Sequence, residues 1–77
     1  MNPWLSLPES LAIVEARNIG VMINRFEQDW AAGKWRWEVS TRLDGCRIET
    51  RGESLEEALH ACLKVHGLLP QTTETEN

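Results

Sequence analysis

One series of apolar residues between positions 7 and 32 recurs at alternating spacings of four and three, which is the period of an amphipathic helix. Its members are Ala12, Ala16, Ile19, Ile23, Phe26 and Trp30. The sequence S-L-P-E at positions 6–9 has the form of a capping box, and Gly33 is placed to end the helix. We therefore predict one long helix over residues 7–32, although Gly20 in its middle costs about 1 kcal/mol relative to alanine.

From position 34 to position 51 the period changes to two, which is typical of β-strands. Asp44-Gly45 lies in the middle and favours a two-residue turn in which both residues have positive φ. The segment therefore predicts a hairpin. A turn at this point pairs Leu43 with Cys46, Glu38 with Arg51 and Arg42 with Arg47. The last pair is mildly unfavourable, which leaves two alternatives, a turn that is looser by one residue or an anion beside the two arginines.

The last predicted element is a second helix, which begins at Ser54. The sequence S-L-E-E at positions 54–57 again has the form of a capping box, and the inner stripe of the helix starts at Leu55. Gly67 ends this helix and Pro70 prevents it from resuming. We expect the polar residues 71–77 to form a disordered tail.

The predicted order is helix, strand, strand, helix, an α+β fold (αββα) that forms a single domain over residues 1–70. Because a lone hairpin is marginally stable and its outer face alternates Arg with Glu, both helices should cover the other face. Pairing a free strand edge with a second copy would give four strands across a homodimer. Val14 and Val21, one heptad apart on the outer arc of the first helix, form a candidate dimer or partner patch.

Composition limits the classes of protein that this chain can represent. It has 77 residues with 12 acidic and 8 basic side chains, a formal charge of −4, which disfavours a dedicated nucleic-acid coat. The longest apolar run is residues 11–14, far shorter than a membrane span, and the first residues lack the basic start of a secretory signal. We therefore expect a cytoplasmic location, away from membranes, with Cys46 and Cys62 as thiols.

The sequence carries no recognisable catalytic or cofactor-binding pattern. No nucleophile can be matched to a base by spacing, and no glycine-rich phosphate loop is present. Cys46, Cys62 and His66 can be drawn as a zinc site, but a fourth ligand and a C-x-x-C pair are lacking, which favours a structural role. We expect a protein that is not an enzyme and binds neither metal nor cofactor.

Four tryptophans are the least expected feature of the chain. Trp30, Trp35 and Trp37 fall within eight residues, and Trp4 precedes the first helix. Large aromatic side chains fill small cores economically, which is the role expected for Trp30 and for one of the hairpin pair. A tryptophan left partly exposed would instead anchor a partner protein. Our candidates for that anchor are Trp4 and Trp37.

Charge is distributed unevenly along the chain. Five basic and three acidic residues give the segment 34–51 a charge of +2, which leaves −6 on the rest. The outer face of the hairpin carries Arg36, Arg42, Arg47 and Arg51. A basic stripe beside aromatics can follow a nucleic-acid backbone, whereas the simpler interpretation is a solvated face with cross-strand ion pairs.

Two resemblances suggest a biological setting. The sequence W-R-W at positions 35–37, followed by E-A-L-H-A-C-L at positions 57–63, resembles small phage or prophage proteins with an α-β-β-α arrangement. The sequence G-E-S-L-E-E-A at positions 52–58 is also similar to the strand-to-helix junction of HicB-type antitoxin lobes, which usually begin with a strand.

The phage resemblance implies a small acidic protein in the host bacterial cytoplasm that binds and inhibits a host protein, as anti-CRISPR and other anti-defence inhibitors do. The carboxylates that it makes candidates for partner binding are Glu9, Glu15, Glu27, Asp29, Glu53, Glu56 and Glu57. The alternative is a homodimeric nucleic-acid-binding or antitoxin-like protein that uses the arginine face of the hairpin.

Overall fold

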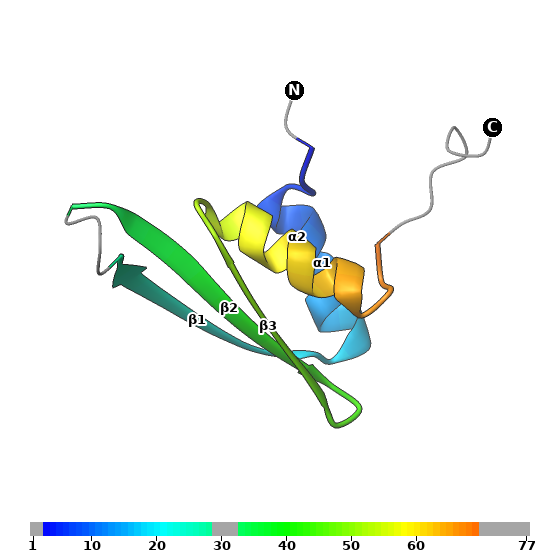
Figure 1. The fold of residues 1–77 in the computed structure, drawn as a ribbon. Coiled ribbons are helices and arrows are strands. Elements are labelled where there is room, and N and C mark those ends of the chain that lie inside the picture. The colour runs from blue at the N-terminus through cyan, green and yellow to red at the C-terminus, as the bar shows by residue number, and fades with distance from the viewer. Residues whose placement is uncertain (1–2, 29–32, 70–77) are drawn as a thin grey trace.

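The computed structural model describes residues 3–28 and 33–69, which fold as an antiparallel sheet with two helices on one side (Figure 1). The elements in chain order are α1 (Leu7–Arg17), β1 (Gly20–Glu27), β2 (Trp35–Leu43), β3 (Cys46–Gly52) and α2 (Leu55–Val65). The strands are neighbours in the order β1-β2-β3, with β2 in the centre. The predicted α+β fold, a hairpin with both helices on one face, is confirmed, and the sheet has a third strand.

The third strand corrects the predicted first helix, which ends at Arg17 instead of residue 32. Asn18 adopts the left-handed conformation (φ 55°, ψ 50°), which a short polar side chain tolerates better than most. The next N–H, that of Ile19, then donates to the Val14 carbonyl at 3.0 Å and closes the end of the helix. The chain leaves this turn as β1. The predicted helix residues 29–32, Trp30 among them, lie outside the described residues.

The apolar residues of β1 match a helical period only by coincidence. Ile23 lies opposite Val39 in the sheet and shares its helix-side face, whereas Phe26 lies opposite Arg36 on the outer face. The β-branched side chains of this segment favour a strand. Pairing with β2 also satisfies backbone groups that a two-stranded hairpin would leave open, so the third strand stabilises the hairpin.

Capping differs between the two helices. At α1 the Ser6 hydroxyl accepts from the Glu9 N–H at 3.3 Å, and Glu9 Oε1 accepts from the Ser6 N–H at 3.1 Å, so the predicted capping box is complete. At α2 the Ser54 hydroxyl accepts from the Glu57 N–H at 3.1 Å, but the Glu57 carboxylate accepts from the Glu53 N–H instead. The second capping box is therefore only half formed.

The hairpin has the predicted register, with Leu43 opposite Cys46, Glu38 opposite Arg51 and Arg42 opposite Arg47. Asp44 and Gly45 both have positive φ, at 51° and 79°, as a type I′ turn requires. The core lies between this hairpin and α2, which packs on β2 and β3 while α1 packs on α2. The buried apolar side chains are Ile19, Val39, Ala58, Leu59, Cys62 and Leu63.

Candidate interaction site

One corner of the helix-side face of the sheet carries exposed aromatic and aliphatic side chains. Trp35 is 50% exposed and Ile23 is 48% exposed. The register places Arg25 opposite Trp37 and Glu27 opposite Trp35, so these side chains lie on the same face as the buried Val39. We call Ile23, Arg25, Trp35 and Trp37 the corner cluster.

Trp35 is exposed because β3 does not reach it. The last pair between β2 and β3 joins Trp37 to Gly52, so Trp35 extends past the end of β3 and has only β1 beside it. Trp37 is half-buried and packs against the core. Trp37 is the predicted anchor, whereas Trp35 is the more exposed of the two in the structure.

Arg25 connects the two tryptophans. Its guanidinium carbon lies 5.6 Å from the ring centroid of Trp35 and 5.4 Å from that of Trp37, both within the range of a cation–π interaction. Among the described residues, no carboxylate forms a salt bridge with Arg25. The two rings therefore position the Arg25 guanidinium beside them, and its N–H groups remain available to an anion.

Trp4 lies in a different environment, against α2. Its ring meets the His60 ring edge-on, with centroids 5.7 Å apart and planes at 61°. The neighbouring Leu5 N–H donates to His60 Nδ1 at 3.0 Å. These contacts fasten the N-terminal segment to α2, and Trp4 is half-buried. Its role as a partner anchor stays a prediction.

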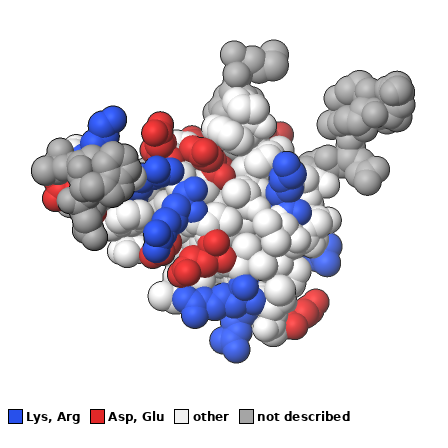
Figure 2. Space-filling view, in the orientation of Figure 1, with Lys and Arg blue, Asp and Glu red and all other residues white. Residues whose placement is uncertain are grey.

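The predicted carboxylates come from separate elements. Glu9 and Glu15 belong to α1, and Glu27 ends β1, where its side chain accepts a hydrogen bond from the Gly33 N–H. The others lie at the start of α2, namely Glu53, Glu56 and Glu57, while Asp29 lies outside the described residues. Figure 2 shows acidic and basic side chains interspersed over the visible face.

Hydrogen bonds to Ser6 lower the pKa of one of these carboxyls. The Ser6 N–H contributes most and the Ser6 hydroxyl adds to it, and together they hold the pKa of Glu9 below its ordinary value. The Glu9 carboxylate therefore serves the capping box of α1. A partner can hydrogen-bond to the Glu9 carboxylate only at the positions that Ser6 leaves unoccupied.

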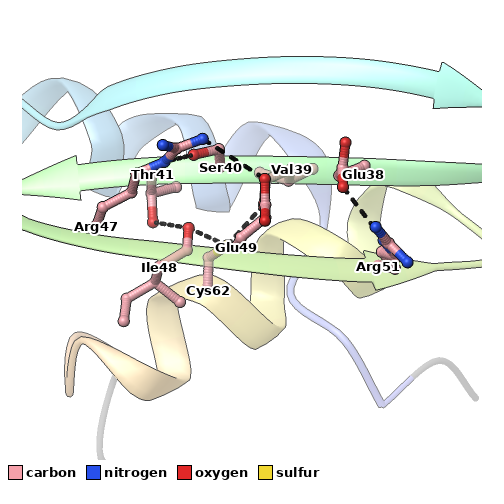
Figure 3. Close-up of polar contacts among 9 residues, drawn as sticks. All are labelled: Glu38, Val39, Ser40, Thr41, Arg47, Ile48, Glu49, Arg51 and Cys62. Carbon is pink, nitrogen blue, oxygen red and sulfur yellow. Dashed lines mark hydrogen bonds and ion pairs between the residues drawn. The ribbon is translucent and has the colours of Figure 1, made fainter.

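The outer face of the sheet carries the predicted arginines, and two of them are engaged (Figure 3). Arg51 Nε lies 3.2 Å from Glu38 Oε2, which is the predicted cross-strand ion pair. Arg47 Nε donates to the Ser40 hydroxyl at 3.0 Å, and its guanidinium lies 3.6 Å from Glu49. Exposed pairs of this kind contribute about 0–1 kcal/mol each, so they orient side chains more than they stabilise the fold.

Arg36 and Arg42 complete the arginine face. Arg36 lies opposite Phe26 and Arg42 opposite Gly20, both in the register of β2 with β1. A shallow depression lies over this part of the outer face, lined by Met22, Ser40, Arg42, Arg47 and the backbone of β1. The depression is a potential anion contact with two arginines at its rim.

The predicted patch of Val14 and Val21 is wrong as a helix surface. Val14 lies in α1 and Val21 in β1, because the helix ends between them. Both side chains are half-buried and pack against the core. Their heptad spacing has no meaning once the second residue belongs to a strand.

The cysteines and His66 lie in different environments. Cys46 is exposed, while Cys62 is fully buried and its Sγ lies 3.3 Å from the Thr50 hydroxyl and 3.4 Å from the Val39 carbonyl oxygen. His66 contacts Thr41 instead. Across residues 3–28 and 33–69, no group of three His, Cys, Asp or Glu side chains is placed to hold a metal ion.

Neither described helix has the length and apolar character needed to cross a membrane.

Comparisons of the chain with protein-family models, with curated proteins and with solved structures found no match.

Proposed function

We propose that the protein is a non-enzymatic interaction module that binds a partner protein through the corner cluster. The observation that carries this proposal is Trp35, half exposed at a corner of the sheet with the Arg25 guanidinium stacked beside it. Tryptophan and arginine are the residues most enriched where binding energy concentrates in protein interfaces. The contacts of Arg25 with both rings restrict its side chain before binding, which lowers the entropy lost when a partner binds.

The chemistry of the corner cluster defines the partner segment that fits it. Trp35 and Ile23 offer apolar surface, and the free N–H groups of Arg25 offer a bidentate contact to a carboxylate. The partner segment therefore combines an apolar side chain with an adjacent Asp or Glu. The resemblance to small phage proteins supports a host protein as the partner and inhibition by occupation of its surface.

The alternative, nucleic-acid binding by the arginine face, has weaker support. Arg51 is paired with Glu38, and Arg47 is bonded to Ser40 and close to Glu49, so only part of the arginine charge is free. The net charge of −4 also opposes the binding of phosphate groups. The mixed charges of this face suit a solvated surface better.

The proposal is tested by capture from a bacterial lysate with wild-type protein and two matched variants. Trp35→Ala removes the anchor, and Arg42→Gln is the control, because Arg42 lies on the opposite face of the same strand. Loss of a hot spot costs about 2 kcal/mol, so Trp35→Ala should reduce recovery of the specific partner about 30-fold, while Arg42→Gln should leave it unchanged. Circular dichroism confirms that both variants are folded. Equal recovery with wild type and Trp35→Ala contradicts the proposal.

A further inference from the structure

The backbone hydrogen bonds of the sheet divide the residues of β1 into two sets. In a hairpin with a two-residue turn, the two residues that flank the turn form a hydrogen-bonded pair, and here these are Leu43 and Cys46. Hydrogen-bonded and non-hydrogen-bonded pairs alternate along antiparallel strands. The backbone groups of odd-numbered β2 residues therefore bond to β3, and those of even-numbered β2 residues bond to β1. The Gln28 N–H, which donates to the Lys34 carbonyl at 2.9 Å, agrees with this parity. The backbone groups that point away from the sheet are therefore those of Val21, Ile23, Arg25 and Glu27.

The other edge of the sheet, at β3, is protected by charge. The same parity makes Arg47, Glu49 and Arg51 the residues whose backbone faces this free edge. All three are charged. Charged side chains on an edge strand are one means by which proteins prevent unwanted strand pairing.

The edge at β1 carries fewer of these protections, because two of its four edge-facing residues, Val21 and Ile23, are uncharged. Residues 20–27 contain neither proline nor lysine, and each pairs with one residue of β2, so no bulge interrupts the strand. Met22, 71% exposed, lies on the outer face, and Ile23, 48% exposed, lies on the helix side. The β1 edge is therefore long and regular, and it carries an exposed apolar side chain on each face.

We propose that the β1 edge pairs with β1 of a second copy, antiparallel about a two-fold axis at Asn24. This register gives the longest ladder, because it pairs all residues from 20 to 28 with their counterparts in reverse order. Four residues per copy, each with one N–H and one C=O, form about eight hydrogen bonds, close to the number in a typical protein interface. The result is a sheet of six strands.

A second copy is favoured over another protein as the source of the added strand, because pairing two copies leaves no β1 edge unpaired. After two β1 edges have joined, the sheet ends on β3 in both copies, where Arg47, Glu49 and Arg51 face outward. No unprotected edge among the described strands remains for a third copy. A heterologous strand would leave this self-complementary geometry unused.

The pairing also covers the exposed apolar side chains. On the outer face Met22 lies opposite Phe26 of the second copy, a favourable contact between sulfur and an aromatic ring. On the helix side Ile23 lies opposite Arg25 of the second copy. The two corner clusters therefore lie side by side across the axis, and Trp35, on β2, lies outside the new strand pair.

The oligomeric state is measured by sedimentation equilibrium of the wild-type chain. We expect a mass of twice 8.8 kDa at protein concentrations of about 100 µM. A mass of 8.8 kDa throughout that range overturns the proposal.

The register is tested by cross-linking in a Cys46→Ser background, which removes the exposed native thiol. Asn24 meets its own counterpart in a pair without hydrogen bonds, where Cα atoms lie about 4.5 Å apart, within the range of a disulfide. Asn24→Cys should therefore form a covalent dimer under mild oxidation, and the control Met22→Cys should not. Cross-linking of Met22→Cys alone overturns the register.

Two proline variants test the edge itself. Ile23→Pro removes only an N–H that points outward, so the variant should stay folded and become monomeric. Asn24→Pro removes a hydrogen bond to β2 and should unfold the sheet. A folded Ile23→Pro variant that remains dimeric overturns the proposal, and if this variant fails to fold, the Asn24→Cys cross-link decides.

The outcomes are separable from those of the proposed function. A monomeric wild-type chain whose partner capture still depends on Trp35 contradicts the dimer and leaves the interaction module standing. A dimer whose capture is indifferent to Trp35→Ala supports the pairing of β1 and contradicts the corner cluster as the partner site.

Discussion

The hydroxyl of Thr41 lies 2.8 Å from Nε2 of His66, and this contact joins the central strand to the C-cap of α2. Thr41 is fully buried, although it is polar, and its hydroxyl also faces the Ile48 carbonyl oxygen at 3.5 Å. A buried hydroxyl is tolerated when it is hydrogen-bonded. The bond to His66 therefore satisfies a polar group of the core at the point where α2 ends.

Replacement of Thr41 by valine tests this contact. The substitution keeps the shape of the side chain but removes the bond to His66, so we expect the free energy of unfolding to fall by about 1 kcal/mol. The measurement is chemical denaturation followed by circular dichroism. Ser40→Ala is the control, because Ser40 lies on the outer face and bonds only to the exposed Arg47; its effect should stay within about 0.5 kcal/mol. Equal effects of the two substitutions would show that the bond to His66 adds nothing.

The capping box of α1 predicts a pH dependence. Because bonds to Ser6 hold the pKa of Glu9 below its ordinary value, folding favours the charged carboxylate. The stability that Glu9 contributes is therefore complete above the unfolded-state pKa of about 4.3 and is lost as the pH falls through the lower folded-state pKa. Carbon-detected NMR titration of the Glu9 carboxyl should give a midpoint below 4.3.

Glu9→Gln provides the comparison for that titration. The variant lacks the titrating group, so the fall in stability between pH 5 and pH 2 should be smaller than in wild type, as measured by urea denaturation. A Glu9 midpoint at or above the ordinary value of a glutamate, or equal acid sensitivity of the two proteins, would remove the capping box as a source of pH dependence.

The two thiols should differ in reactivity. Cys46 is exposed beside the hairpin turn, whereas Cys62 is fully buried on the face of α2 that packs against the sheet. An aromatic disulfide reagent should therefore label one thiol rapidly in the native protein and both in denaturant. Cys46→Ser should abolish the rapid phase. Rapid labelling of two thiols in the native protein would mean that α2 does not keep Cys62 packed against the sheet.

The hairpin could be predicted from the sequence because its signal is local. Asp44 and Gly45 require positive φ at adjacent positions, and that requirement alone sets which residues of β2 and β3 face each other. The second helix could be predicted from the sequence equally well, since Ser54 and Gly67 mark its ends. In these segments the turn, the period and the caps agree.

The end of the first helix could not be predicted in the same way. Ile19, Ile23 and Phe26 are spaced for a helix, and the pattern does not reveal that Ile23 and Phe26 lie on opposite faces of a strand. The signals that count against the helix are Asn18 and Gly20, one as a C-cap and one as a weak helix former. Tertiary pairing with β2 then decides in favour of β1.

The corner cluster depends on the same pairing. Arg25 reaches Trp35 and Trp37 only because β1 runs antiparallel to β2, and a helical Arg25 would have no such neighbours. Trp35 is exposed because β3 ends at Gly52, and the residues around Trp35 do not indicate where β3 ends. The tryptophans can therefore be identified as candidates from the sequence, but their relative exposure depends on the pairing of the strands.

Amide hydrogen exchange along residues 20–27, followed by NMR at two protein concentrations, tests the central claim that β1 is an edge strand open to a second copy. The amides of Met22, Asn24 and Phe26, which bond to β2, should be protected at every concentration. Those of Val21, Ile23 and Arg25 should exchange freely in dilute protein and become protected as its concentration rises. Free exchange of this second set at all concentrations, or protection of consecutive amides as in a helix, would contradict the account.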